Sequence, residues 1–356
     1  MNHEYKCPCC GGAITFDSDI QKMKCPYCDT EFDVQAFTEH EDISGEAEEL
    51  NWEKSAGREW DPGETDGMTE YACNSCGGTI ICDYTTAATK CPYCGNPVVM
   101  MGNVSGVLKP DLIIPFKKSK EDAKQAYFNH LKGKKLLPDT FRDKNHIDEI
   151  KGVYVPFWLF DSDTKAHLRF KATRVRHWTS GDYYYTETSY FSVIRGGNVG
   201  FELIPVDGSS AIPDDIMESI EPFDISEADS FHTAYFAGYM ADKYDVDSES
   251  SKERANTRIR NSTTALFRGE VRGYNTVNVE HSTIRLFNSN VQYAMYPVWI
   301  LNTTWEGKNY LFAMNGQTGK FVGDLPMDKK KYWTRFFIYL VIFTALILAA
   351  VFYFSA

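Results

Sequence analysis

The stretch Cys7-Pro-Cys-Cys10-Gly-Gly, followed by Cys25-Pro-Tyr-Cys28, decides the fold of the N-terminal region, because the chain contains it twice. The second copy reads Cys73-Asn-Ser-Cys76-Gly-Gly and Cys91-Pro-Tyr-Cys94, offset by 66 positions at all four cysteines. A C-x2-C pair presents two thiolates from one tight turn, and two such turns supply the four sulfurs of a tetrahedral metal site. The repeat therefore predicts two metal sites with the ligands Cys7, Cys10, Cys25, Cys28, Cys73, Cys76, Cys91 and Cys94.

The repeat also separates ligands from spare cysteines. The residue 66 positions after Cys9 is Ser75, whereas the residue 66 positions after Cys10 is Cys76. We therefore take Cys10 as the ligand and Cys9 as a spare thiol. Cys82 has no cysteine counterpart in the first copy, and we expect it to be a small apolar side chain in the core.

Zinc is the metal that we expect at both sites. A segment of about 35 residues cannot bury enough apolar surface to fold unaided, and structural zinc contributes on the order of 10–16 kcal/mol in sites of this size. Two alternatives stay open, namely disulfides and an iron centre of the rubredoxin type, to which Cys91-Pro-Tyr-Cys94-Gly95 would also be suited. Four protein sulfurs leave no coordination position for a substrate water, so the sites are predicted to be structural.

The distribution of cysteines favours a reducing compartment. All ten precede residue 95, and the remaining 262 residues contain none, so nothing beyond the repeats relies on a disulfide. Residues 1–20 lack an apolar core, and we therefore expect no N-terminal signal peptide.

The C-terminal end predicts one membrane-spanning helix. Phe336 to Phe354 are 19 residues without a charge, and at about 1.5 Å per residue they would cross the roughly 30 Å hydrocarbon core of a bilayer. A buried core helix is the alternative, but it would be apolar on every face. By the positive-inside rule, the cations before the span predict a single-pass protein of the cell membrane with its N-terminal body in the cytoplasm; they are Lys329, Lys330, Lys331 and Arg335.

The negative charge of the chain is concentrated in one segment. The formal net charge is −12 at pH 7, and residues 39–66 alone hold eleven acidic residues against two basic ones. Duplex binding depends on Lys and Arg contacts with phosphates. The charge pattern therefore disfavours nucleic acid as a partner.

We predict an α+β protein in which two small rubredoxin-like ribbons precede a β-rich domain. The predicted segments are zinc ribbon 1 (residues 1–38, called ribbon 1 below), an acidic linker (39–67), zinc ribbon 2 (68–102, ribbon 2), an α+β domain (103–325), a basic juxtamembrane segment (326–335) and a transmembrane helix (336–354).

Sequence periodicity predicts the elements of the α+β domain. One helix is expected over residues 119–132 with Ser119 as its N-cap, one from Ser226 and one over 248–267. Asn315-Gly316 predicts a two-residue hairpin turn. Strands are expected at 109–116, 153–160, 166–172, 183–194, 199–206, 276–287, 291–301 and 309–314.

Trp52 and Trp60 are unusual within the acidic linker, part of which (46–54) has a helical pattern. We expect the two indoles to pack locally on a ribbon; the alternative is that they bind a partner.

The sequence contains no catalytic motif that we could identify. It has no P-loop, no His-Glu-x-x-His, no G-x-S-x-G and no dinucleotide fingerprint. Asp161 and Asp163 follow a predicted strand without a partner base, and we expect them to be solvated. We therefore predict that the protein is not an enzyme and takes no small-molecule substrate.

Several of these motifs together resemble a family of bacterial zinc-ribbon membrane proteins. The motifs are the paired ribbons, Leu108-Lys-Pro-Asp, Ile114-Pro-Phe, Lys151-Gly-Val-Tyr-Val-Pro-Phe-Trp-Leu-Phe160 and Asn315-Gly-Gln-Thr-Gly319. Members are often labelled as TFIIB-type zinc ribbon proteins or, mistakenly, as primosomal helicases. One member, from Bacillus, is encoded beside a phage-shock-type protein and a flotillin-like SPFH protein. The resemblance implies a membrane complex that recruits the SPFH partner during envelope stress, and it implies no catalytic residues.

Two functions from different classes are therefore compared. The first is a membrane-anchored adaptor whose cytoplasmic ribbons dock protein partners, here an SPFH/flotillin-like protein and another membrane subunit. The alternative is a nucleic-acid-binding zinc-ribbon protein tethered to the membrane. The acidic flanks of the ribbons favour the first function.

Overall fold

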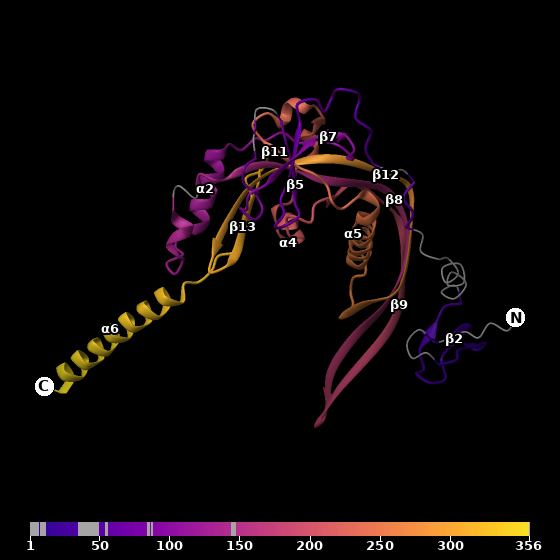
Figure 1. The fold of residues 1–356 in the computed structure, drawn as a ribbon. Coiled ribbons are helices and arrows are strands. Elements are labelled where there is room, and N and C mark those ends of the chain that lie inside the picture. The colour runs from indigo at the N-terminus through magenta and orange to yellow at the C-terminus, as the bar shows by residue number, and fades with distance from the viewer. Residues whose placement is uncertain are drawn as a thin grey trace. The chain divides into compact units, whose positions relative to one another are not determined.

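The computed structural model describes residue 7 and residues 12–34, 50–53, 56–83, 86, 88–143 and 147–355. Over these ranges the chain is a mixed α+β protein that consists mostly of sheet, as the sequence predicts (Figure 1). The chain forms two compact units. Unit 1 comprises residues 1–56, 159–206 and 249–291, and unit 2 comprises residues 57–158, 207–248 and 292–356.

The strands are short in the N-terminal third and long in the rest of the chain. Their bounds are β1 (Thr15–Asp17), β2 (Lys22–Lys24), β3 (Glu31–Phe32), β4 (Thr69–Ala72), β5 (Thr79–Cys82), β6 (Val99–Asn103), β7 (Leu112–Ile113), β8 (Lys151–Ser180), β9 (Tyr183–Asp207), β10 (Asp229–Ser230), β11 (Met240–Asp242), β12 (Thr276–Trp305), β13 (Lys308–Asn315) and β14 (Phe321–Gly323).

Both α-helices and short 3-10 helices occur in the described ranges. They are α2 (Lys120–Leu131), α4 (Asp214–Ile220), α5 (Ser248–Gly269), α6 (Lys329–Ser355), η1 (Asp139–Arg142), η2 (Ile225–Glu227) and η3 (Thr233–Phe236).

The sheet of unit 2 incorporates the strands of ribbon 2. Along the sheet the order is β10-β7-β12-β8-β11-β5-β4-β6, with β13 and β14 attached beside β12. The domain strand β11 pairs antiparallel with β5 of ribbon 2 and parallel with β8. Residues 153–158 of β8 are buried without interruption, as expected for a strand covered on both faces. Ribbon 2 is thus continuous with the domain through backbone hydrogen bonds.

Helix α2 covers part of this sheet and confirms the predicted capping. The Ser119 hydroxyl accepts a hydrogen bond from the Asp122 backbone N–H at 3.1 Å, and an Asp122 carboxylate oxygen accepts one from the Ser119 backbone N–H at 2.9 Å. This reciprocal pair is a capping box. The buried face of the helix packs into a core with β12 and β13; the shared core residues include Ala123, Tyr127, Leu131, Leu301, Phe312 and Met314.

Unit 1 is built on the distal part of β8, on β9 and on α5. Strands β8 and β9 pair as a long hairpin (Figure 1), and the turn between them uses Gly181 at φ +60°, a conformation that glycine adopts without a steric penalty. Alternate residues of β8 face the core, confirming the predicted period of two. These core-facing residues pack against Ile259 and Phe267 of α5. They are Ala166, Leu168, Phe170 and Ala172.

The predicted helix from Ser226 is wrong. Residues 225–236 form η2, the short strand β10 and η3 instead. Asp229 and Ser230 pair with Ile113 and Leu112 of β7, so pairing with a distant strand overrides the helical spacing of the local apolar residues.

Predicted breaks inside three long strands are also wrong. Residues 151–180 form one strand, β8, residues 183–207 form β9, and residues 276–305 form β12. The break predicted before residue 291 falls on Asn288, a positive-φ residue (φ 53°) that stays within β12, and β9 contains a second such residue at Leu203 (φ 54°). A local kink of one residue leaves the ladder continuous on either side.

The connection after Asn315 is a hairpin, but its loop spans residues 316–320 and is longer than the predicted two residues. The buried Asn315 amide donates to the carbonyl oxygens of Ile220 and Pro222, at 3.0 and 3.1 Å. The Gln317 side chain donates to the Asp224 carbonyl and accepts from its N–H. This loop therefore holds the segment after α4, a long-range role that turn propensity does not reveal.

The two linker tryptophans, Trp52 and Trp60, contact residues of the α+β domain and not the ribbons as predicted. In unit 1, the Trp52 indole N–H donates to the Asn256 side-chain oxygen at 3.0 Å, and its ring meets Phe160 edge-on at 4.8 Å. In unit 2, the Trp60 ring meets Phe231 edge-on at 5.7 Å. Most of the helical pattern predicted at 46–54 lies outside the described residues.

Helix α6 contains the predicted membrane span. It starts at Lys329, earlier than the predicted 336, so the basic juxtamembrane residues belong to the helix itself. From Lys329 to Tyr353 it is long and apolar enough to cross a membrane, and none of its most apolar window is buried within the protein. Asp328 begins the helix by accepting bonds from the N–H groups of Lys330 and Lys331.

Candidate metal centres

Each cysteine pair sits on a knuckle whose shape comes from backbone hydrogen bonds. In ribbon 2, the Cys73 N–H donates to the Gly78 carbonyl at 2.9 Å, and the Gly77 N–H donates back to the Cys73 carbonyl at 2.9 Å. The second knuckle repeats this between Cys91 and residues 95 and 96. Gly77 and Gly95 take positive φ angles, which explains why glycine follows the second cysteine of both pairs in ribbon 2; Asp29 takes the same conformation after Cys28 in ribbon 1.

The four thiols of ribbon 2 converge on one point. Their sulfurs all lie within 4.8 Å of one another. The Cys73 and Cys94 sulfurs are 3.5 Å apart, and those of Cys76 and Cys91 are 3.6 Å apart. A tetrahedral ion with bonds of about 2.3 Å to sulfur separates its ligands by about 3.8 Å, whereas a disulfide bond measures about 2.05 Å. The geometry therefore fits a metal ion, and these cysteines are free thiols.

Ribbon 1 brings together three of its four predicted ligands. The sulfurs of Cys7, Cys25 and Cys28 lie within 4.8 Å of one another, and those of Cys7 and Cys28 are 3.6 Å apart. The backbone bonds of the knuckles recur, with the Cys7 N–H donating to the Gly12 carbonyl and the Cys25 N–H to the Thr30 carbonyl. Cys10, the predicted fourth ligand, lies outside the described residues, as does Cys9.

The surroundings push the thiol pKa values of ribbon 2 apart. Burial raises the pKa of Cys73, but the backbone N–H groups of Cys76 and Ser75 outweigh it and bring the value down to about 7. Burial raises the pKa of Cys76 to about 11 and raises that of Cys91 further. A cation at the centre favours the thiolate form of every ligand.

Side chains beside the sulfurs complete the outer shell of each centre. The Asn96 amide donates to the Cys94 sulfur at 3.4 Å in ribbon 2. In ribbon 1 the Thr30 hydroxyl lies 3.2 Å from the Cys28 sulfur. Such bonds orient a thiolate and disperse its charge. The described candidate ligands at both centres are sulfur, and the four sulfurs of ribbon 2 would suit a structural ion and leave no coordination position for a reacting water.

The two ribbons differ in what surrounds equivalent positions. Tyr93 is 4% exposed, whereas Tyr27, its counterpart in ribbon 1, is 74% exposed. Within ribbon 2, Cys82 is fully buried, as predicted, and burial raises the pKa of its thiol to about 12. Its counterpart Phe16 is 50% exposed. The same fold element therefore presents a surface in one copy and a buried face in the other.

The partner strands explain this difference. In ribbon 1, Thr15 and Phe16 pair with Lys24 and Met23 of the same ribbon. Their counterparts in ribbon 2 pair with the domain strand β11 on one side and with β4 on the other. One pairing is common to both copies, since the bridge Lys90–Pro97 corresponds to Lys24–Glu31.

Two side chains that hold ribbon 2 in place were not anticipated from the sequence. The Asn302 amide donates to the Tyr93 carbonyl at 2.6 Å. Asp242 is buried near Tyr93 and Ser209, and burial raises its pKa to about 7. Neither residue lies near the cysteines in sequence. In the sequence, Asp242 is only an acidic residue at the end of a short apolar run. Such residues are common at sheet edges, so the pattern does not indicate a contact with ribbon 2.

Asp161 and Asp163 have structural partners within unit 1. An Asp161 carboxylate oxygen accepts from the Leu203 N–H at 2.6 Å, and Asp163 accepts from the Asn288 amide at 3.0 Å. Leu203 and Asn288 are positive-φ residues of β9 and β12. The carboxylates thus stabilise the two kinks, rather than being solvated as predicted.

The sequence is similar to a curated bacterial protein. It is 36% identical over 327 residues to a Bacillus subtilis (strain 168) protein called uncharacterized protein YdjG, and the alignment covers 92% of this chain and 91% of the relative. No family model matches the sequence. No solved structure matches it significantly.

Proposed function

This chain belongs to the same family as the Bacillus subtilis protein YdjG, and we propose that it is a membrane-anchored adaptor that recruits a protein partner through a zinc ribbon. Unit 2 would serve as the rigid base, ribbon 1 as the docking module and α6 as the anchor. The relative's name states no activity, so the proposal rests on the residues of this chain and on the motif resemblance described above.

The contrast between the two ribbons is the observation that carries the proposal. Ribbon 2 has its equivalent surface covered by β11, whereas ribbon 1 exposes several large apolar side chains. Scattered single apolar residues on a surface are normal, but a group on so small a module marks an interaction surface. The exposed large apolar residues in the described part of ribbon 1 are Phe16, Ile20, Tyr27 and Val34.

Zinc is the proposed ion at both centres. An all-sulfur tetrahedral shell suits zinc and also iron. Zinc has no visible absorption, while ferric thiolate is coloured, so the spectrum of the purified protein distinguishes the two. Two zinc ions per chain by elemental analysis, with a colourless solution, would support the proposal. A red protein that contains iron would contradict it.

Helix α6 is proposed to cross the cell membrane with the rest of the chain in the cytoplasm. Support comes from its apolar length and from the cations Lys329, Lys330, Lys331 and Arg335 at its start. Truncation after Lys331 should release the protein into the soluble fraction. Continued sedimentation of the truncated chain with membranes would indicate another anchor.

A protein is the proposed partner of ribbon 1, and the motif resemblance points to an SPFH/flotillin-like protein of an envelope-stress complex. A second membrane subunit is also expected, because one span alone encloses no pore. Nucleic acid is a weaker candidate, since the linker between the ribbons carries eleven acids and two bases over residues 39–66 and would repel phosphates.

The test is affinity purification of the full-length protein in mild detergent followed by mass spectrometry of co-purifying proteins. Tyr27→Ala should lose the partner while both metal ions are retained. Tyr183→Ala is a matched control, because Tyr183 is 71% exposed but lies on β9. Equal capture by wild type and Tyr27→Ala would contradict docking on ribbon 1.

The edge strand of ribbon 2 supplies a second comparison. Strand β6 lies at the end of the described sheet order and exposes Val99, Met100 and Met101. If Met100→Ser loses the partner and Tyr27→Ala does not, the docking surface is this edge and not ribbon 1.

A further inference from the structure

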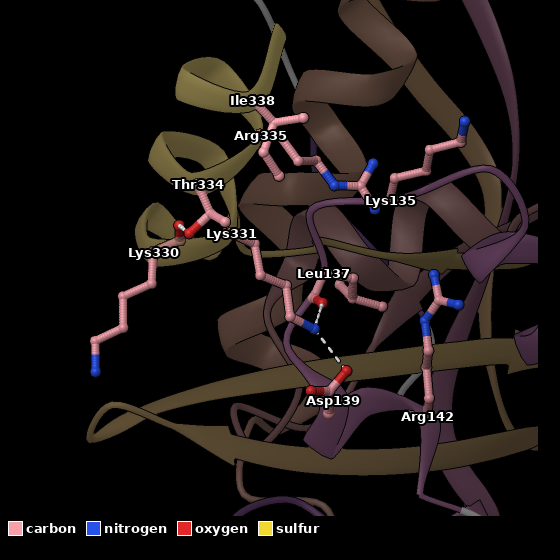
Figure 2. A pocket seen from close by; sticks show the side chains of 9 residues that line it. All are labelled: Lys135, Leu137, Asp139, Arg142, Lys330, Lys331, Thr334, Arg335 and Ile338. Atoms are coloured by element: carbon pink, nitrogen blue, oxygen red, sulfur yellow. Dashed lines mark hydrogen bonds and ion pairs between the residues drawn. The ribbon is translucent and has the colours of Figure 1, made fainter. Parts of the chain in front are cut away.

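A basic hollow of about 560 Å³ lies where α6 leaves unit 2. Figure 2 shows its walls: α6 contributes Lys330, Lys331 and Arg335, and the segment around η1 contributes Lys135 and Arg142. These five cations line the hollow together with a single acidic residue, Asp139. This group of positive charges lies in a chain whose formal net charge is −12.

The one acid in the hollow is already paired. The Lys331 ammonium donates to Asp139 at 2.5 Å and to the Leu137 carbonyl at 2.9 Å (Figure 2). This contact lowers the Asp139 pKa, so the carboxylate stays ionised. It also ties the start of α6 to the η1 segment. Lys331 and Asp139 therefore neutralise each other, and their contact holds α6 against the η1 segment, so that these two walls of the hollow stay together.

The other cations retain their charge without a carboxylate. Arg142 donates to the Lys134 carbonyl at 2.9 Å, and its charge contributes, after that of Lys331, to the lowered pKa of Asp139. Lys135, Lys330 and Arg335 have no carboxylate within ion-pair distance in the described part of the chain. In Figure 2, Arg335 and Arg142 extend from α6 and from η1, while the ammonium groups of Lys330 and Lys135 point away from the other labelled side chains. The hollow thus offers guanidinium donors for one anion, with further positive charge nearby.

The hollow is amphipathic along the direction of α6. Ile338 lines it one turn beyond Arg335, and Leu137 forms part of its wall. Tyr332 and Trp333 on the same turn are of the residue types found at the level of lipid head groups. A ligand that fits would carry an anionic group beside the arginines and an apolar part along Ile338.

We propose that this hollow binds the phosphate of an acidic glycerophospholipid, with Arg335 and Arg142 as ligands and Lys135 as an additional nearby positive charge. The proposal rests on the membrane anchoring proposed above. A dissolved polyanion would be repelled by the net negative charge of the chain, whereas a lipid of the inner leaflet reaches the hollow along α6. The lipid would hold the η1 segment of unit 2 at the membrane surface, through residues far from α6 in sequence.

The experiment uses the full-length protein in detergent micelles and native mass spectrometry with added lipid. Phosphatidylglycerol and phosphatidylcholine, which share acyl chains and differ in net charge, are titrated separately. Wild type should retain phosphatidylglycerol in preference. K135Q should reduce this preference roughly fivefold, and K135Q/R142Q should reduce it further, because each juxtamembrane cation contributes about that factor.

Matched controls separate the site from general charge. K132Q/K134Q removes two cations from the same segment, outside the hollow, and should leave the lipid preference unchanged. Equal retention of the two lipids by wild type, or equal loss in both double variants, would overturn the proposal. Sodium phosphate is a third arm: full displacement of the lipid at an equal concentration would show a site for free phosphate and overturn the lipid assignment.

This assay is independent of the anchor. Wild type that retains phosphatidylglycerol selectively but does not sediment with cell membranes would contradict the anchoring and leave the lipid site standing. Wild type that sediments with membranes but binds the two lipids equally would contradict the lipid site and leave the anchoring standing.

Discussion

Ribbon 1 and ribbon 2 share a cysteine pattern, an offset of 66 positions and the backbone bonds of their knuckles, yet they differ in dependence on the rest of the chain. Ribbon 2 contributes strands β4, β5 and β6 to the sheet of unit 2. The described strands of ribbon 1 form a separate three-stranded sheet, β1-β2-β3, with a small core of its own. A repeated motif can therefore contribute strands to a large sheet in one copy and form a small sheet of its own in the other.

The difference is concentrated at a few equivalent positions. Each tyrosine of the second knuckle crowds a glycine of the first, as Tyr27 does with Gly12 and Tyr93 with Gly78. The ring–glycine contact belongs to the ribbon fold itself. Only Tyr93 is also covered by the domain, which places Asp242 against it. Substitutions at paired positions should separate what the ribbon needs from what the domain adds.

The largest contrast is expected from the ligands. Cys91→Ser should unfold ribbon 2 together with the sheet of unit 2, because loss of a structural zinc removes on the order of 10 kcal/mol, comparable to the whole stability of a domain. Cys25→Ser should unfold ribbon 1 alone. Calorimetry and limited proteolysis report the unfolding, and elemental analysis should show one ion per chain in both variants.

Both variants should still fractionate with membranes, because α6 is separate from the ribbons. Similar melting of unit 2 in Cys25→Ser and Cys91→Ser would show that the ribbons are equally integrated and would remove the contrast. Loss of either variant from the membrane fraction would contradict a modular anchor.

The next contrast is between the two tyrosines. Tyr93→Ala should lower the free energy of unfolding of unit 2 by roughly 3–5 kcal/mol, as for other buried aromatic truncations. Tyr27→Ala should cost under about 1 kcal/mol, since exposed positions contribute little. Urea denaturation of the truncated soluble chain measures both. Equal costs for the two variants would place Tyr27 in a buried interface instead.

A pH-dependent contribution to stability is expected where strand β11 packs beside ribbon 2, at Asp242. Burial raises the Asp242 pKa to about 7. An acid that binds its proton more tightly in the folded state favours folding at low pH, so the free energy of unfolding should fall as pH rises from about 4 to about 7. Asp242→Asn should be more stable than wild type at pH 8 by up to a few kcal/mol, and the difference should shrink toward pH 5.

The exposed Asp324→Asn is the control for that measurement, because it changes one carboxylate of unit 2 without altering a buried group. A wild-type profile parallel to that of Asp242→Asn between pH 5 and pH 8 would assign the pH dependence to other groups.

The smallest difference in stability is expected between Phe16 of ribbon 1 and its counterpart Cys82 of ribbon 2. Phe16→Ser should change the stability of ribbon 1 by about 0.5 kcal/mol or less, because half of its surface is exposed. Cys82→Ser should cost on the order of 1–3 kcal/mol by placing a hydroxyl in a fully buried site. Chemical denaturation of each variant tests the pair, and a larger cost at Phe16 would reverse the comparison.

Local patterns predicted a large part of the fold. The capped helix α2, helix α5, the alternating part of β8 and the apolar C-terminal helix follow from residues close in sequence, since capping and periodicity are local properties. Residues 225–236 were predicted wrongly as a helix because Asp229 and Ser230 pair with β7. That pairing depends on residues more than a hundred positions away, which a local pattern does not contain.

The candidate metal sites divide in the same way. Spacing and repetition identified seven described cysteines that the structure gathers into two clusters, because thiolate ligands of one knuckle are fixed by a few consecutive residues. The roles of β11, Asn302 and Asp242 beside Tyr93 were not predicted. They depend on which strand lies next to β5, and the repeat carries no information on its neighbours.

The sequence by itself identified the cysteines that form the two described clusters and the presence of an apolar C-terminal helix, because these depend on spacing and composition. Only the tertiary structure decided that ribbon 2 is part of a large sheet while its twin keeps an exposed surface. It also brought Lys135 and Arg142 beside Arg335. The physical reason is that strand pairing and side-chain burial join residues far apart in the chain, and an amino-acid pattern read in order does not specify those partners.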